Sequence, residues 1–97
     1  MQHKINWSDD ASTDLDEIRA YLEDFSRQTA NRILSRIIAQ ANRLAVFPYR
    51  CPLIIDDSPM RRLVVDDYSV FYVIFEASET VEVLRVWHHS RDIGQLM

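Results

Sequence analysis

Cysteine and glycine are almost absent from this sequence, which has one of each among 97 residues. Cys51 has no partner for an internal disulfide and is most simply a small apolar side chain in the core. The three histidines, His3, His88 and His89, are scattered and give no metal-ligand spacing with it. We therefore expect neither a metal nor a cofactor.

Apolar runs long enough to cross a membrane are also missing. None approaches the about 20 residues that span a bilayer. The opening MQHKINWSDD lacks the apolar middle of a signal peptide. We expect a cytoplasmic protein with no membrane partner.

A surplus of basic charge is the third absence. The chain has 11 basic and 15 acidic residues, giving a formal net charge of −4. Neither half of the sequence has an excess of basic residues. Proteins whose main task is gripping nucleic acid usually carry a basic surplus to neutralise phosphates. With 47% hydrophobic residues, the chain is long enough for one core and too short for two. We expect a single domain over residues 1–97.

A short strand and two helices are predicted in the first half of the chain. Lys4–Trp7 alternates as a strand, Ser8 can cap one helix, and Ser26 can cap a second that ends at Pro48. Hardly any residues separate the helices, so they must form an antiparallel hairpin. The predicted apolar stripes are Ala11, Leu15, Ile18, Leu22 and Phe25 on the first helix and Ala30, Ile33, Leu34, Ile37, Ile38, Ala41, Leu44 and Ala45 on the second.

Three strands are predicted in the second half, at Arg61–Val65, Tyr68–Glu76 and Thr80–His88. The short breaks between them indicate an antiparallel meander, with Asp66-Asp67 in the place of a turn glycine. The sequence therefore predicts an α+β fold of order β-α-α-β-β-β. In this fold the helical hairpin is packed on one face of a mainly antiparallel sheet. The place of the first strand in the sheet stays open.

Alternation along the last strand sorts its side chains onto two faces, with Val81, Val83, Arg85 and Trp87 on one and Glu82, Leu84, Val86 and His88 on the other. Leu84 and Val86 suit the face covered by the helices, which leaves Arg85 and Trp87 on the open face, where they could meet a partner. For Trp87, capping the core is an equally good interpretation. The acidic residues of the first helix are expected to be solvated: Asp14, Asp16, Glu17, Glu23 and Asp24.

Three segments together resemble the RelE/ParE family of type II toxins, also called plasmid stabilisation proteins. They are LAVFP (Leu44–Pro48), RRLVVDDYSVFYVIFE (Arg61–Glu76) and VEVLRVWHHSRDI (Val81–Ile93). The resemblance implies a small toxin held inactive by a cognate antitoxin, ParD-like or related. RelE-like members cleave messenger RNA in the ribosome, whereas ParE-like members are associated with poisoning DNA gyrase.

The site residues favour the ParE-like branch. Val64 occupies the place of an arginine that a RelE-like site uses, with Arg62 two residues earlier as a same-face substitute, and Gly94–Met97 contains no tyrosine. We therefore expect a non-enzymatic gyrase inhibitor that meets its target at the exposed end of the last strand. The target-binding candidates are Arg85, Trp87, His88, His89 and Arg91.

Two other interpretations stay open. A ribosome-dependent mRNA endonuclease would use Arg62, His89 and Arg91 as an alternative catalytic set. A binding module with the same fold and no toxicity is the third possibility. Some candidates also have purely structural explanations, because one of the two neighbouring histidines can be structural and Arg91-Asp92 can be a local ion pair.

Overall fold

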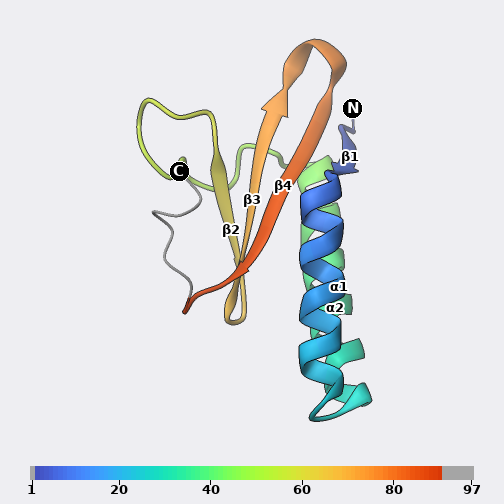
Figure 1. Ribbon diagram of the computed structural model, residues 1–97. Helices are drawn as coiled ribbons and strands as arrows, with labels where there is room; N and C mark the ends of the chain where they lie inside the picture. Colours follow the sequence, from blue (N-terminus) through green and yellow to red (C-terminus); the bar gives the residue numbers. More distant parts are fainter. Residues whose placement is uncertain (1, 91–97) are drawn as a thin grey trace.

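The computed structural model describes residues 2–90, and its elements follow the predicted order. They are β1 (Lys4–Trp7), α1 (Asp9–Glu23), α2 (Arg27–Asn42), the 3-10 turn η1 (Arg43–Ala45), β2 (Arg61–Val65), β3 (Tyr68–Phe75), the 3-10 turn η2 (Glu76–Ser78) and β4 (Thr80–His88). The predicted α+β architecture is confirmed (Figure 1).

Both predicted helix caps are present. The Ser8 hydroxyl accepts a hydrogen bond from the backbone N–H of Ala11 at 3.0 Å, and the Ser26 hydroxyl accepts one from Thr29 at 3.2 Å. Each bond satisfies one of the backbone donors left open at a helix start. Because so few residues join α1 to α2, the two helices run antiparallel, side by side (Figure 1).

The sheet has the strand order β1-β4-β3-β2. β2, β3 and β4 form the predicted antiparallel meander, and β1 pairs in parallel with β4 at the edge of the sheet, which answers the question of its position. Asp66, in the β2–β3 turn, has a φ of 54°, so aspartate does take the left-handed conformation that glycine usually supplies.

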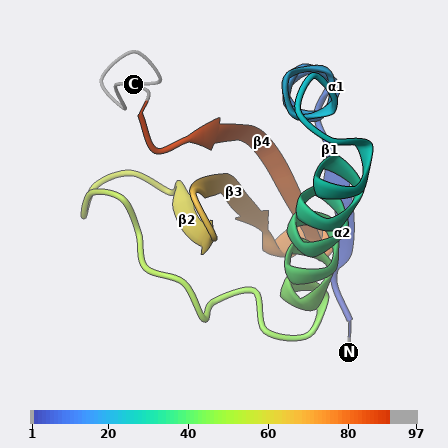
Figure 2. The same cartoon turned by 90° about the horizontal axis from the view of Figure 1, so that it is seen from below.

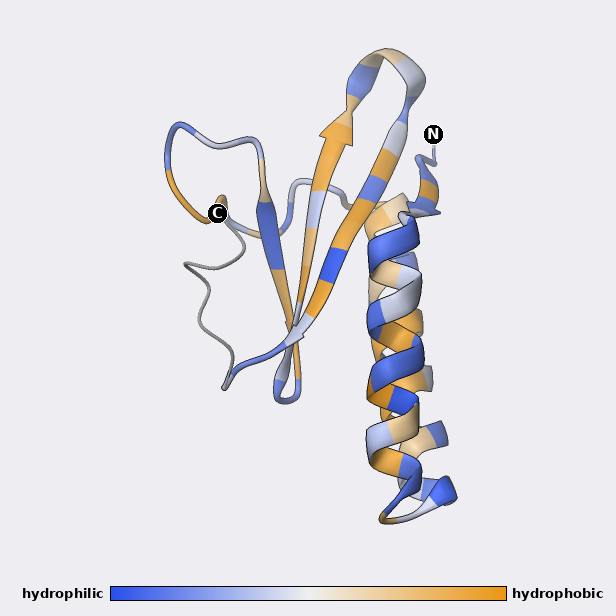
Figure 3. Ribbon diagram, viewed as in Figure 1, coloured by the Kyte–Doolittle hydropathy of each residue, from blue (hydrophilic) through white to orange (hydrophobic). Residues whose placement is uncertain are grey.

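The helices cover one face of this sheet unevenly. α1 contacts β4, while α2 contacts β2 and β3 (Figure 2). The core between them consists mainly of apolar side chains, and Figure 3 shows β3 orange over most of its length. The largest fully buried side chains are Tyr72, Ile37, Leu44, Val70, Val81, Val83 and Val86. Cys51 is buried in the same core, as predicted.

A β-bulge in β4 corrects the predicted division of its side chains. Phe71 pairs with Arg85, but the next residue of β3 pairs with Val83, so Leu84 is an extra residue without a partner in β3. The extra residue reverses the alternation, and Val81, Val83 and Val86 all face the core. The prediction that Val81 and Val83 lie on the face opposite to Val86 was therefore wrong.

Candidate functional site

The outer edge of β4 becomes free where β1 ends. β1 pairs only as far as Trp7 with Val83, and the residues that follow take over the remaining edge groups. The Ser8 backbone N–H donates to the Val83 carbonyl at 3.0 Å, and its hydroxyl donates to the Leu84 carbonyl at 2.9 Å. The start of α1 is thereby fixed against the last strand.

Asp14 continues this attachment from within α1. Its Oδ2 accepts from the Val86 backbone N–H at 2.9 Å and from Nε of Arg85 at 2.8 Å, and its Oδ1 accepts from Nη2 of Arg85 at 2.9 Å. The bidentate geometry is the strong form of an arginine–carboxylate pair. The Asp14 carboxylate raises the pKa of Arg85 above its ordinary value, and Asp10 and Glu17 add to this effect.

Asp14 is only 3% exposed, so the expectation that it is solvated was wrong. The carboxylate is buried because it replaces the strand partner that the edge of β4 lacks. A signal was present in the sequence, since Asp14 lies three residues after Ala11 and four before Ile18, on the apolar stripe of the helix.

Trp87 is buried as well, with 6% of its surface exposed. It lies on the sheet face away from the helices, as predicted. Of the two interpretations that the sequence left open, its burial supports a packing role and contradicts an exposed contact. The guanidinium carbon of Arg85 lies 5.3 Å from the centroid of its ring, a cation–π distance. The Arg85 side chain therefore contacts both Asp14 and the indole of Trp87. Neither Arg85 nor Trp87 is freely exposed.

His88 and His89 are exposed at the end of β4, as predicted. The His88 ring packs edge-on against Tyr68, with 5.2 Å between the centroids. Its Nδ1 accepts from the Ser90 backbone N–H at 3.1 Å and lies 2.8 Å from the Ser90 hydroxyl, so the neutral ring carries its proton on Nε2. The His89 backbone N–H donates to the Asp67 carbonyl. Arg91 lies outside the described residues.

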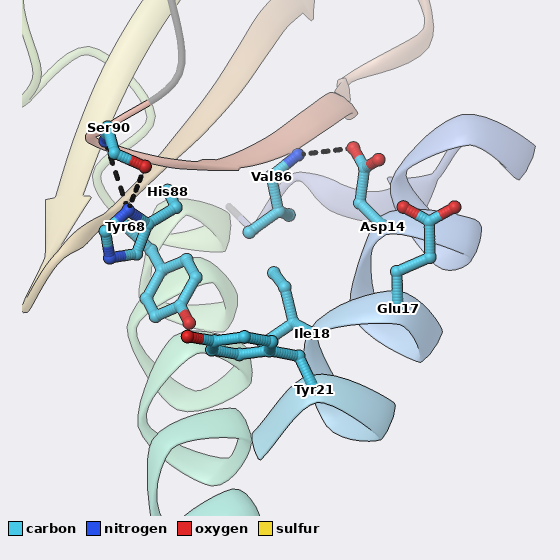
Figure 4. A pocket seen from close by; sticks show the side chains of 8 residues that line it. All are labelled: Asp14, Glu17, Ile18, Tyr21, Tyr68, Val86, His88 and Ser90. Atoms are coloured by element: carbon cyan, nitrogen blue, oxygen red, sulfur yellow. Dashed lines mark hydrogen bonds between the residues drawn. The ribbon is translucent and has the colours of Figure 1, made fainter. Parts of the chain in front are cut away.

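A cavity of about 370 Å³ opens between α1 and the ends of β3 and β4 (Figure 4). Figure 4 shows Tyr21 and Tyr68 on one side, with their hydroxyl groups directed toward each other, and Asp14 and Glu17 on the opposite side. The residues that line the cavity are Asp14, Glu17, Ile18, Tyr21, Tyr68, Val86, His88 and Ser90. Of the predicted site residues that lie within residues 2–90, only His88 contributes to it.

The alternative ribonuclease residues are not joined into a cluster in the part of the chain that is described. The Arg62 Nε donates to the Ser69 hydroxyl at 2.8 Å, on the sheet face away from the helices, while His89 lies past the end of β4. Val64 is 55% exposed on β2 and carries no charge. Within residues 2–90 no hydrogen bond connects Arg62 to His89.

Sequence analysis missed Tyr21, Tyr68 and Glu17 as members of one site. None of the three was assigned to a site, and Glu17 was expected only to be solvated. These three side chains come together because of the way α1 lies across β4. The periodicity of the sequence does not predict that arrangement. No group of His, Cys, Asp and Glu residues suited to a metal occurs within residues 2–90, and no helix there is long and apolar enough to cross a bilayer.

The helical hairpin packed on a four-stranded mixed sheet matches the fold of RelE/ParE toxins. The family model described as the ParE toxin of the type II toxin–antitoxin system parDE matches residues 5–93. The chain therefore belongs to this family of toxins. No match was found among curated proteins.

Solved structures share the fold. The RelBE2 toxin–antitoxin complex from Mycobacterium tuberculosis contains a chain with a TM-score of 0.73 and 21% identity, aligned over 91% of this protein and 99% of that chain. A chain of the chromosomal ParDE system from P. aeruginosa has a TM-score of 0.75 and 19% identity, over 90% and 96% of the two chains. The archaeal RelE–RelB complex from Pyrococcus horikoshii OT3 gives a TM-score of 0.53 and 14% identity, over 95% and 100%.

Proposed function

We propose that this toxin is ParE-like, inhibits DNA gyrase in the cytoplasm, and is neutralised by a cognate antitoxin. The match of the ParE family model to residues 5–93 carries the proposal. Partnership with an antitoxin draws further support from the solved relatives, which include a RelBE2 and an archaeal RelE–RelB complex.

The weakness of any ribonuclease site favours the gyrase branch. RNA cleavage without a metal needs a cation for the developing phosphate charge and groups that move protons. Val64 supplies no charge, Arg62 is bonded to Ser69, and Arg85 is bonded to Asp14. The net charge of −4 also disfavours docking on ribosomal RNA.

The end of β4 offers the surface that would meet the target. His88 and His89 are exposed there, and Arg91 follows in the sequence. We propose these three as the target contacts. Arg85 and Trp87 contribute by holding the strand end in place through Asp14 rather than by exposed contact.

Gyrase supercoiling with purified toxin tests the proposal. The toxin should block supercoiling or trap cleaved DNA, and the double variant His88→Ala/His89→Ala should require about tenfold more protein for the same effect. Arg32→Ala, exposed on α2, is the control and should inhibit as the unaltered toxin does. Normal supercoiling at saturating toxin contradicts the proposal.

A ribosome-dependent mRNA endonuclease is the second candidate, favoured by the similarity of the fold to chains of RelE–RelB complexes. It would use Arg62, His89 and Arg91. Primer extension on translated message after induction would then show cuts in phase with codons, and Arg62→Ala would abolish them. If no cuts appear, this candidate is removed.

A non-toxic binding module with the same fold makes a different prediction. Expression without antitoxin would leave growth unaffected, whereas either toxin activity would stop it. Induction followed by separate assays of DNA supercoiling and of translation shows which of the two processes fails first.

A further inference from the structure

The surface of α1 carries a concentrated negative charge. Asp9–Glu23 contains six carboxylates and a single guanidinium, that of Arg19. Figure 3 shows this helix blue, hydrophilic, along much of its exposed length. A charged helix face alone is usually just solvated. Here, however, the acidic face borders a cavity with aromatic walls.

The cavity combines three kinds of surface. Ile18 and Val86 form an apolar base, the rings of Tyr21 and Tyr68 form one wall, and the carboxylate of Glu17 lies at the opposite rim (Figure 4). Its volume of about 370 Å³ is at the lower end of the about 300–1,000 Å³ typical of ligand sites. It therefore has room for a single side chain or a small ligand, not for a large cofactor.

The two carboxylates at the cavity differ in whether they already have hydrogen-bond partners. Oδ2 of Asp14 accepts hydrogen bonds from Arg85 and from the Val86 N–H, and Oδ1 accepts one from Arg85. The Glu17 side chain is exposed and makes no ion pair or hydrogen bond within residues 2–90. One carboxylate is thus available for a cation that enters the cavity.

An exposed aromatic ridge extends the site along α1. Tyr21 is 62% exposed and Phe25 is 72% exposed, with their ring centroids 5.3 Å apart in an edge-on arrangement. Glu17 lies one helical turn before Tyr21, so these two share a face of α1. Phe25 follows the end of the helix, and its ring contact with Tyr21 continues the same surface. A partner that fills the cavity would cover this ridge too.

We propose that this cavity binds an arginine side chain of the antitoxin. The inference rests on the antitoxin partnership proposed above. A guanidinium is planar, stacks on tyrosine rings and forms paired hydrogen bonds with a carboxylate, which matches the two tyrosines and Glu17. The three methylene groups of the arginine side chain contact Ile18 and Val86, and apolar residues of the same antitoxin segment cover Tyr21 and Phe25.

The isolated toxin can be titrated with N-acetyl-arginine amide while its NMR spectrum is recorded. Saturable shifts are expected for Ile18, Tyr68 and Val86, with an affinity at least about fivefold higher than for N-acetyl-citrulline amide, which has the same shape without the charge. Equal affinities for the two probes, or no saturable shift at these residues, would overturn the inference.

Two variants on the same helix sharpen the test. Glu17→Gln should weaken binding of the arginine probe about three- to tenfold, because it removes the carboxylate at the rim. Asp16→Asn removes the same charge from the neighbouring exposed position, outside the cavity, and should change the affinity less than twofold. If both variants weaken binding equally, the probe responds to general charge and the assignment is wrong.

The antitoxin complex provides the second readout. In the complex, Glu17→Gln should raise the dissociation rate of the antitoxin at least about threefold, with Asp16→Asn as the control. An unchanged rate would show that the antitoxin places no arginine here and would overturn the inference. Neither experiment involves gyrase, so its outcome is independent of whether gyrase inhibition is confirmed.

Discussion

Asp14 is the residue on which the most contacts in the candidate site depend. It is a buried carboxylate that joins two positions of β4, 71 and 72 residues further along the chain. A charge is tolerated in this place because both carboxylate oxygens accept hydrogen bonds, three in all, from a guanidinium and from a backbone N–H. The Asp14 carboxylate therefore accepts a hydrogen bond from the edge of β4 that a longer β1 would otherwise accept.

Removing this side chain should destabilise the protein considerably. Asp14→Ala leaves the Val86 N–H and Arg85 without their acceptor, and we expect a loss of about 2–3 kcal/mol in the free energy of unfolding, limited because Arg85 keeps 29% of its side chain exposed to water. Urea denaturation followed by circular dichroism measures this. Asp16→Ala, fully on the surface, should change it by less than about 0.5 kcal/mol. Similar losses in the two variants would contradict the structural role of Asp14.

The raised pKa of Tyr72 predicts that the protein loses stability at alkaline pH. Burial, followed by its interaction with Cys51, raises the pKa of this tyrosine well above its ordinary value of 10.0. Below that value both folded and unfolded states hold the proton, and the stabilisation is complete. As the pH rises above about 10, the unfolded chain ionises first and the folded state loses stability.

The variant Tyr72→Phe should lose less stability between about pH 9 and pH 11 than the unaltered protein. At pH 7 it should be less stable by about 1 kcal/mol, because the Tyr72 hydroxyl no longer donates to the Pro48 carbonyl. Urea midpoints over this pH range test both parts. An alkaline loss as steep in the variant as in the unaltered protein would contradict the assignment.

At the scale of elements, the serines that cap the two helices differ in the number of hydrogen bonds that their hydroxyls make. The Ser26 hydroxyl only caps α2, whereas the Ser8 hydroxyl caps α1 and also donates to the Leu84 carbonyl. Ser8 thus links the end of β1, the start of α1 and the bulged residue of β4. The bulge and the helix start are fixed by the same side chain.

Matched substitutions at the two caps should therefore have unequal effects. We expect Ser26→Ala to reduce the free energy of unfolding by about 1 kcal/mol, as for an ordinary cap, and Ser8→Ala by about 2 kcal/mol because a second hydrogen bond is lost. Denaturation curves of both variants give the comparison. Equal losses would indicate that the bond to Leu84 contributes nothing.

At the scale of the whole molecule, the N-terminal segment contacts both 3-10 turns at the end opposite the proposed target surface. His3 lies next to Glu76 of η2, with 2.8 Å between Nε2 and Oε1, and its backbone N–H donates to the Ala45 carbonyl at 2.7 Å. Segments that are far apart in the sequence, β1, η1 and η2, are thereby joined. Figure 1 shows the N-terminus at this end of the helices.

This junction predicts an acid-dependent change in stability. Hydrogen bonds from His3 and then Tyr49 lower the pKa of Glu76 below its ordinary value of 4.5. The stabilisation is present above that value and is lost as the pH falls through the lowered pKa of the folded state. Glu76→Gln should therefore reduce the loss of stability between about pH 5 and pH 3, measured by urea midpoints. Glu79→Gln, three residues away, is the control, and an identical acid profile in both variants would contradict the prediction.

The sequence by itself determined the elements and most of their arrangement. Apolar positions spaced three and four apart specify helices, alternation specifies strands, and Ser8, Ser26 and Asp66 mark where elements start or turn. These are local preferences, so they can be identified without knowing the rest of the chain. The aromatic strand and the end of β4 also sufficed for the family, which the match over residues 5–93 confirms.

Only the tertiary structure decided which side chains meet. Periodicity counts residues at a constant interval, so one extra residue at Leu84 was enough to misplace the faces of β4. Asp14 is buried, and Tyr21, Tyr68 and Glu17 share a cavity, because α1 lies against the free edge of β4. Trp87 is buried on the other face of the sheet, where the guanidinium of Arg85 lies over its ring. Such contacts join segments more than 40 residues apart, and their energy depends on the packing of whole elements rather than on the preferences of neighbouring residues.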